Sequence, residues 1–191
     1  MRNFIKLSFT MLLALLLFTG CSNEDNPLDS TDPGNGGNQV IIKTPKYMEL
    51  TKIILTRFPV NKSNGDKWDY HVFPSSPTRR PDIYVDLSKS GSSSHVFRSD
   101  IREDAIFETA YDNFVFTKPV SSNDGSLPYS VPVNQTYKID VWDDDGLTAD
   151  DWMGSVSVNA AGYYNDDNAT NIYKTLKSCE ITIRIEGRWI Y

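Results

Sequence analysis

A run of aspartates is the feature of this 191-residue sequence best suited to binding chemistry. Asp143, Asp144 and Asp145 follow an alternating apolar segment, and Asp150 and Asp151 precede the next one, so five carboxylates fall within nine positions. Asp143 and Asp145 are two residues apart and therefore project to the same side of an extended chain. If the segment folds back as a hairpin, Asp151 returns to face them. Three carboxylates would then converge on one point.

Carboxylates gathered in this way repel one another, by about 4 kcal/mol for a pair 4 Å apart at an effective dielectric constant of 20. A hard divalent cation relieves that repulsion. Ca²⁺ accepts about six to eight oxygen ligands in irregular geometry, whereas Mg²⁺ requires stricter octahedral placement. The spacing therefore predicts a calcium site. In the alternative interpretation the aspartates only cap turns by accepting hydrogen bonds from nearby backbone amides, as residues 143–146 alone would do.

Alternating apolar and polar residues predict the strands that position these aspartates. The alternation is regular over 83–87, 137–141 and 179–186, where Cys179 is expected to be a small buried residue. Less regular apolar stretches occur at 48–58, 95–98, 114–116, 129–133 and 153–158. Clusters of Gly, Pro, Asn, Asp and Ser separate these stretches. Seven or eight strands without a convincing helix predict an all-β fold, an antiparallel β-sandwich.

Two motifs resemble a known family. Trp142-Asp143-x-Asp145, followed by Asp151-Trp152-Met153-Gly154, is similar to the third calcium loop of the C2 domain, the β-sandwich of protein kinase C and the synaptotagmins. The segment Pro81-Asp82-Ile83-Tyr84-Val85-Asp86-Leu87 resembles that family's Ser-Asp-Pro-Tyr-Val-Lys-Leu strand. The resemblance covers about 48–187 and implies an eight-stranded antiparallel β-sandwich with calcium bound at one tip.

The resemblance also implies the ligands, which would be Asp82, Asp143, Asp145 and Asp151. The family takes a further aspartate from its first loop, where this chain has Ser76. We expect Asp69 to replace it, with Asp66 as the alternative. The side chains of Trp68, Tyr70 and Leu147 are candidate contacts to a partner at the tip. A departure from the family is Asp86, which stands where the family usually has Lys and makes a polybasic lipid site doubtful.

The N-terminus has the pattern of a secretion signal. Arg2 and Lys6 precede an apolar run at 11–18 that is too short to span a bilayer, and Thr19-Gly20-Cys21 follows it. Residues 17–21 resemble the lipobox of bacterial lipoproteins, with Phe18 where Leu is usual. This resemblance implies that residues 1–20 are a lipoprotein signal peptide and that Cys21 carries the lipid, palmitate included. An ordinary secretory signal followed by an incidental cysteine is the alternative.

Residues 21–45 are expected to form a lipidated, flexible tether, because Asn, Gly, Asp, Ser and Pro cannot bury enough apolar surface to fold. Residues 46–191 would then be the β-sandwich. The acidic residues just after Cys21 resemble the export signal of some surface lipoproteins. We therefore expect an outer-membrane lipid anchor that displays the domain at the cell surface, with the periplasmic face as the alternative.

Composition excludes several function classes. The formal net charge is −6, so phosphate-mediated binding of nucleic acid is not expected. Two cysteines and two histidines leave little material for a disulfide framework, a zinc site or a Ser–His–Asp triad. We predict a non-enzymatic, calcium-binding module that mediates interaction with a protein, a glycan or a lipid. The alternatives are a structural lipoprotein whose aspartates bind no functional ion, and a glycoside-acting enzyme that uses two loop carboxylates.

Overall fold

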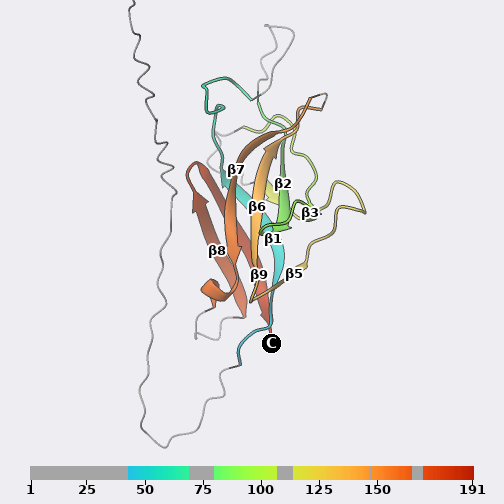
Figure 1. The fold of residues 1–191 in the computed structure, drawn as a ribbon, viewed down its shortest axis with the longest axis vertical. Helices are drawn as coiled ribbons and strands as arrows, with labels where there is room; N and C mark the ends of the chain where they lie inside the picture. The colour runs from blue at the N-terminus through green and yellow to red at the C-terminus, as the bar shows by residue number, and fades with distance from the viewer. Residues whose placement is uncertain (1–42, 69–79, 107–113, 147, 165–169) are drawn as a thin grey trace, which may run out of the picture.

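The computed structural model describes residues 43–68, 80–106, 114–146, 148–164 and 170–191, and it shows two antiparallel β-sheets packed against each other (Figure 1). One sheet has the order β4-β1-β9-β8, with β5 also paired to β1, and the other has the order β3-β2-β6-β7. The strands are β1 (Tyr47–Arg57), β2 (Ile83–Lys89), β3 (His95–Arg98), β4 (Phe114–Phe116), β5 (Tyr129–Pro132), β6 (Thr136–Asp143), β7 (Asp151–Asn159), β8 (Asn171–Ser178) and β9 (Ile181–Ile190). A single turn of 3-10 helix, Ala161–Tyr163, follows β7. The prediction of an all-β antiparallel sandwich is confirmed.

The described residues form nine strands, whereas eight were expected. The additional strand is β8, which was not among the eight predicted stretches. In the same sheet, the first half of β1 pairs with β5 and its second half pairs with β4. The two short strands occupy one edge position in turn, so the sandwich has eight strand positions filled by nine segments. The eight-position architecture therefore agrees with the expectation.

The regular alternation produces the core, as expected. Ile83, Val85 and Leu87 of β2 are fully buried, whereas the intervening side chains point to the other face of the sheet. The inward residues of the other two regular strands are also fully or almost fully buried, namely Ile139, Val141, Ile181, Ile183 and Ile185. These side chains pack together with those of β1 in one hydrophobic cluster that joins the two sheets.

The prediction for Cys179 was wrong. The regular strand begins at Ile181, and Cys179 lies with Glu180 in the tight turn between β8 and β9, where its side chain is exposed. Its φ of 47° places it in the left-handed region, which a two-residue hairpin turn requires. The period-two pattern therefore extended two residues too far toward the N-terminus.

The two ends of the sandwich differ in what they carry. At one end Tyr47, which begins β1, pairs with Ile190 close to the C-terminus. The connection between β6 and β7 lies at the opposite end (Figure 1). Because β1 spans eleven residues, about 35 Å of strand separates the two ends. Within the described part of the chain, no helix is long and apolar enough to cross a membrane.

Candidate functional site

The predicted calcium ligands meet where β6 ends and β7 begins. Asp143 is the last residue of β6 and is the cross-strand partner of Asp151, the first residue of β7. Asp143 also pairs with Ile83 on β2, next to Asp82. We call Asp143, Asp144, Asp145, Asp150 and Asp151 the acidic tip. The hairpin predicted from the spacing of these residues is therefore present.

Asp82 and Asp143 are joined through the backbone. The amide of Asp82 donates a 2.8 Å hydrogen bond to Oδ1 of Asp143, and the amide of Asp144 donates one of 2.8 Å to the carbonyl of Asp82. Oδ1 of Asp82 itself accepts a 2.7 Å hydrogen bond from the amide of Asp104. Asp82 therefore lies beside the acidic tip as predicted, but its carboxylate is engaged by the neighbouring loop.

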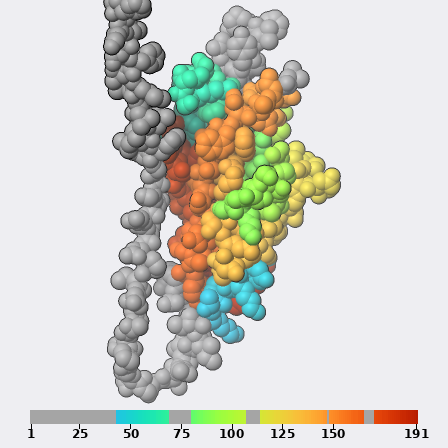
Figure 2. Space-filling model, viewed as in Figure 1, coloured from blue at the N-terminus to red at the C-terminus, as the bar shows by residue number. Residues whose placement is uncertain are grey.

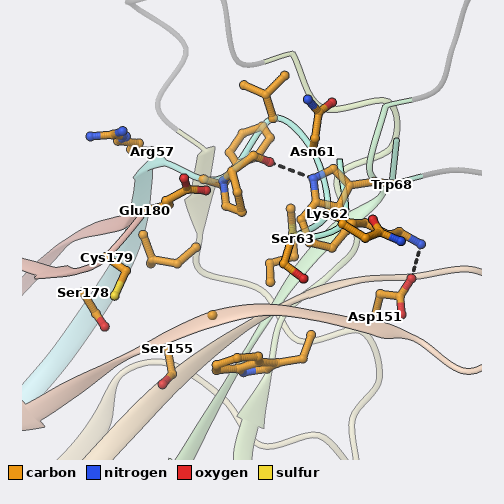
Figure 3. Close-up of a pocket in the computed structure, with 18 of the residues that line it drawn as sticks. Arg57, Asn61, Lys62, Ser63, Trp68, Asp151, Ser155, Ser178, Cys179 and Glu180 are labelled. Carbon is orange, nitrogen blue, oxygen red and sulfur yellow. Dashed lines mark hydrogen bonds and ion pairs between the residues drawn. The ribbon is translucent and has the colours of Figure 1, made fainter. Parts of the chain in front are cut away.

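A lysine from a distant loop enters the acidic tip. The Nζ of Lys62 forms an ion pair with Oδ2 of Asp151 (Figure 3). The lysine is held by its own turn, because its amide donates to the carbonyl of Asp66 and its carbonyl accepts from the amide of Gly65. Its ammonium also lies 5.8 Å from the centroid of the Trp68 ring, a cation–π contact. Figure 2 shows this loop (teal) and the acidic tip (orange) at the same end of the molecule.

The charges at this end act on Lys62 together. Burial lowers the pKa of Lys62, but the hydrogen bond to Asp151 and the negative charges of Asp151, Asp145 and Asp143 outweigh it, and the pKa is raised above its usual value. The ammonium therefore experiences the field of three predicted ligands at once. It stands as a positive charge among carboxylates that would otherwise repel one another.

The pKa of Asp145 is raised by its surroundings. Burial raises the pKa of Asp145, the charge of Lys62 lowers it, and the charges of Asp151, Asp150 and Asp144 raise it again, with a net increase. A carboxyl group with a raised pKa is one whose charged form is destabilised by its surroundings. Additional positive charge near Asp145 would therefore stabilise its charged form.

Asp150 has a partner within the sandwich. The hydroxyl of Tyr84 on β2 donates a 2.7 Å hydrogen bond to Oδ2 of Asp150. Burial, followed by this hydrogen bond, raises the pKa of the Tyr84 phenol well above its usual value. Asp150 was not predicted as a ligand, and the structure assigns it this supporting contact.

The described residues contain no group of three or more His, Cys, Asp or Glu side chains placed so that together they could hold a metal ion. The four described residues predicted as ligands nevertheless carry the hard oxygen donors that Ca²⁺ prefers, and Lys62 is a cation paired with one of them, Asp151. The donor chemistry thus fits calcium, and the ligand set remains a prediction. Asp69, Tyr70 and Leu147 lie outside the described residues.

The alternative first-loop ligand, Asp66, is not directed to the acidic tip. Its carboxylate accepts a 2.7 Å hydrogen bond from the side-chain amide of Asn64, and its backbone amide donates to the side-chain oxygen of Asn64. These contacts close a local turn, as aspartate and asparagine commonly do.

The prediction that Trp68 contacts a partner was wrong. The side chain of Trp68 is 4 % exposed and belongs to the hydrophobic core cluster. Its indole N–H donates a 2.7 Å hydrogen bond to the carbonyl of Pro59, which satisfies its only polar atom. Trp68 therefore fixes the loop that carries Lys62 onto the sandwich.

A groove adjoins the acidic tip. Its cavity volume is about 940 Å³, and it lies between the loop after β1, the first half of β7 and the β8–β9 turn. Figure 3 shows Asn61 and Lys62 from the loop, and Ser155 and Ser178 from the strands, arranged around it. The ion pair between Lys62 and Asp151 forms one wall, so the groove and the acidic tip share residues.

The outer face of β2 and β3 lacks the basic character of a lipid site. Arg98 is paired in a bidentate manner with Asp86, through Nε–Oδ1 and Nη2–Oδ2 distances of 2.8 and 2.7 Å. Lys138 on β6 is likewise paired with Asp140 at 2.7 Å. Asp86, which stands where the C2 family usually has Lys, thus neutralises Arg98 within the protein.

Comparisons with known proteins give structural neighbours only. No protein-family model matches the chain, and no curated protein matches it. Solved structures that resemble it include human GIVD cytosolic phospholipase A2 in complex with methyl gamma-linolenyl fluorophosphonate (TM-score 0.45, 13 % identity, 78 % of this chain and 18 % of that chain). The first C2 domain, domain A, of plant extended synaptotagmin 1 gives a TM-score of 0.43 at 11 % identity over 78 % of this chain and 97 % of that chain. The paired C2 domains, A and B, of extended synaptotagmin 2 give a TM-score of 0.42 at 13 % identity over 88 % of this chain and 49 % of that chain.

The neighbours therefore include C2 domains, but similarities of this size carry no functional argument. The assignment of the sandwich rests on its own two sheets and their strand order. The chain spans less than a fifth of the phospholipase chain, so nothing of that enzyme's activity is transferred to it.

Sequence reasoning missed Lys62 and did not single out Trp152 as a surface residue. Lys62 is 89 residues from its partner Asp151, and no local spacing relates the two. Trp152 was part of the recognised motif, and its place beside a run of aspartates was a signal that it would lie at the surface. Its side chain is 55 % exposed.

Proposed function

We propose that this protein is a lipid-anchored binding module of a bacterial cell envelope whose acidic tip takes up calcium in exchange for the ammonium of Lys62. The observation that carries this proposal is the ion pair of Lys62 with Asp151, together with the negative charges of Asp145 and Asp143, which also raise the pKa of this lysine. A site that already attracts one positive charge from a distant loop is electrostatically prepared for a divalent ion.

The exchange is energetically reasonable because the ion pair that must open is partly exposed. The side chain of Lys62 is 26 % exposed and that of Asp151 is 43 % exposed. Exposed ion pairs contribute about 0–1 kcal/mol to stability. A divalent cation that gains several carboxylate oxygens outweighs such a contribution, and Lys62 can then turn toward solvent.

The residues that would hold the ion are Asp143, Asp145 and Asp151, with Asp82 beside them. When bound, the ion would supply two positive charges beside Asp145, whose pKa is raised chiefly by burial and further by the charges of Asp151, Asp150 and Asp144. Asp143 is fully buried, so it fixes the inner limit of the site, whereas Asp145 and Asp151 are partly exposed and give access from solvent.

The arrangement of the two ends supports a role outside the anchoring membrane. The first described residues precede β1 at the end where the C-terminus lies, whereas the connection between β6 and β7, which carries the acidic tip, lies at the opposite end (Figure 1). A lipid on Cys21 would therefore attach the domain by the end remote from the acidic tip. We propose that the tip, at the end remote from this attachment, meets a protein, glycan or lipid of another surface.

A second candidate function is a structural domain that binds no functional ion. The observation in its favour is that the described carboxylates are partly compensated within the chain, by Lys62 at Asp151 and by Tyr84 at Asp150. In that case the ion pair only fixes the loop after β1 to the sandwich.

Thermal unfolding distinguishes the two functions. Extracellular calcium modules bind with dissociation constants of about 10⁻⁴ to 10⁻³ M. At 5 mM calcium a ligand of this affinity, bound only by the native state, stabilises by about 1–2 kcal/mol. For a domain of this size the melting temperature should rise by roughly 3–6 °C. Identical melting curves in calcium and in chelator would support the structural candidate instead.

The anchor is tested separately by fractionation of cells that produce the protein. We expect the unaltered protein in the membrane fraction and the Cys21→Ser variant outside it. Membrane association of the variant at the level of the unaltered protein would remove the lipid anchor from the proposal and would leave the calcium question untouched.

A further inference from the structure

The free edge of β7 is capped in its second half. Among the described strands β7 pairs with β6 alone, so alternate residues of β7 turn their amide and carbonyl groups away from β6. The hydroxyl of Tyr163 donates a 3.1 Å hydrogen bond to the carbonyl of Ser157 and accepts one of 3.0 Å from the amide of Asn159. The single turn of 3-10 helix after β7 therefore covers the edge at these two residues.

The main chain of Ser155 has the same orientation but no such cap. Ser155, Ser157 and Asn159 are two residues apart along an uninterrupted register with β6, so their main-chain groups point to the same side. Among the described residues, neither the amide nor the carbonyl of Ser155 has a backbone hydrogen-bond partner on that side. An unpaired edge of this kind is a template for another extended chain.

This open part of the edge faces the groove beside the acidic tip. Ser155 lines the groove, yet its side chain lies on the opposite side of the β7 ribbon from Lys62 (Figure 3). The contribution of Ser155 to the lining is therefore its main chain, and the neighbouring Gly154, which also lines the groove, has no side chain. No residue of β6 borders the groove, so the groove lies on the side of β7 that faces away from β6.

The groove has room for one extended chain. Its cavity volume of about 940 Å³ lies within the range of about 300–1,000 Å³ that is usual for ligand sites. The part of β7 that borders it, residues 151–155, extends over about 15 Å. The loop after β1 and the β8–β9 turn flank this part of the edge. A single extended segment can lie between them, whereas the edge of a second folded sandwich would meet both.

The lining indicates what kind of segment fits. It includes apolar side chains of the core, namely Phe58, Met153 and Ile181. Arg57 and Glu180 also line the groove and form no ion pair with another described residue, whereas Lys62 is engaged by Asp151. Because these two charges are opposite in sign, the lining complements a segment that carries an acidic and a basic residue and little net charge.

We infer that an extended peptide segment of a partner protein adds to β7 in this groove as a further strand. Main-chain hydrogen bonds with Ser155 supply the pairing, as they do where peptides add to the edge of a sheet. Apolar side chains at alternate positions of the segment meet the core side chains of the lining. The inference rests on the proposed function, since it takes the domain to be a binding module, and it names a protein as the partner. The pairing itself requires no calcium.

Selection from a phage-displayed library of random peptides, each of about ten residues, tests the inference. The target is the protein without residues 1–21, which keeps every described residue. We expect selected peptides to slow hydrogen exchange of the Ser155 amide about tenfold or more, while exchange of the Asn159 amide, already bonded to Tyr163, changes little. Methylation of alternate backbone nitrogens of a selected peptide should abolish binding for one of the two alternating sets and spare the other, because only one set faces β7.

Two proline variants isolate the main chain of Ser155. Ser155→Pro removes the amide hydrogen that faces the groove and leaves the pairing with β6 intact, so affinity for the selected peptides should fall about tenfold or more. Ser157→Pro makes the same change on the same strand outside the groove, and it should bind as the unaltered protein does. The melting temperature shows whether each variant is folded. If Ser155→Pro does not fold, the two methylated peptides decide the result.

The inference is overturned if no selected peptide slows exchange at Ser155, if the two folded proline variants bind alike, or if both methylated peptides bind as well as the parent. Self-association of the protein that is lost in Ser155→Pro would make a second copy of the chain the occupant and would equally contradict it. Failure of the calcium proposal would be seen separately, as melting curves that do not respond to calcium while peptide binding is the same in calcium and in chelator.

Discussion

Lys62 and Asp151 are 89 residues apart in the sequence, yet their ion pair joins the loop after β1 to the first residue of β7. The pair places a positive charge on Asp151, and the charges of Asp145 and Asp143, which were also predicted to bind calcium, act on the same lysine. The ammonium of Lys62 therefore partly relieves the repulsion among the carboxylates of the acidic tip. Whether calcium can replace this lysine is the question on which the function depends.

Replacement of Lys62 should separate its effect on stability from its effect on calcium affinity. In Lys62→Met the carboxylates lose their internal cation, so the melting temperature in chelator should fall, by the equivalent of about 1 kcal/mol or less. Calcium no longer competes with the lysine, and its affinity should rise up to about fivefold. Calcium titrations followed by melting temperature measure both effects.

Lys52→Met is the matched control for this prediction. Lys52 lies on β1 and forms a 2.9 Å ion pair with Glu186, away from the acidic tip. Its loss should cost a similar small amount of stability and leave calcium affinity unchanged. If both variants alter calcium affinity equally, the effect is one of net charge and not of the pair with Asp151.

Calcium binding should weaken as the pH falls, and it should do so through Asp145. The pKa of Asp145 is raised, chiefly by burial, so this carboxyl takes up a proton at a higher pH than an ordinary aspartate. Protons then compete with calcium for it. Without calcium, the stability of the domain depends on pH in the opposite direction. Because the pKa of Asp145 is raised in the folded state, its protonation favours folding, and this contribution to stability is lost as the pH rises through the folded-state pKa.

The measurement is the calcium-induced shift in melting temperature at pH 7, 6 and 5. We expect the shift to shrink with acidification, and Asp145→Asn to remove both the shift and its pH dependence. A calcium-induced shift in Asp145→Asn equal to that of the unaltered protein would show that Asp145 takes no part in binding.

Anionic vesicles should not capture the protein. The chain carries a formal net charge of −6, and two cations of the outer face, Arg98 and Lys138, are paired with Asp86 and Asp140. In a sedimentation assay with phosphatidylserine vesicles and calcium, the protein without its lipid should stay in the supernatant. Calcium-dependent sedimentation would instead make another membrane the partner of the acidic tip.

Gly154 should tolerate no side chain. Its φ is 148°, and a Cβ at this position would lie 2.6 Å from Cγ1 of Ile181 in the core. Gly154→Ala should therefore destabilise the domain by about 2 kcal/mol through backbone strain and steric conflict. Gly162→Ala, where the nearest atom would be 3.6 Å away, should have a smaller effect in the same denaturation experiment. Equal stabilities would contradict the packing described for β7 against β9.

The strands that the sequence predicted well were those with one apolar face. Ile83, Val85 and Leu87 alternate strictly with outward-facing residues, and they lie in a strand with the expected bounds to within two residues. The register of Asp143 opposite Asp151 was also predictable, because a hairpin with period-two side chains leaves few alternatives.

β8 could not be recognised in the same way. It is an edge strand in which Ile172 is buried, whereas Tyr173 is exposed and Leu176 only partly buried, so its apolar residues do not alternate. Edge strands bury little surface on either face and leave a weak pattern. The exposed turn at Cys179 was misassigned for a related reason, since the regular pattern of β9 happened to continue into it.

The contact between Lys62 and Asp151 could not be predicted from local sequence patterns. Lys62 pairs with Asp151 from a loop that the core packing of Trp68 helps to fix. Nothing in the spacing of loop residues indicates which of them will meet a strand 89 positions later. The residues that compose the acidic tip were thus predictable, and the cation that lies among them was not.

Isothermal titration of calcium into the chain that lacks residues 1–21 tests the central claim most directly. We predict saturable heat with a dissociation constant of about 10⁻⁴ to 10⁻³ M, lost in Asp145→Asn and kept in Asp124→Asn, whose carboxylate pairs with His95 in another loop. No heat beyond dilution in the unaltered protein, or equal binding by the two variants, would contradict the claim that the acidic tip takes up calcium.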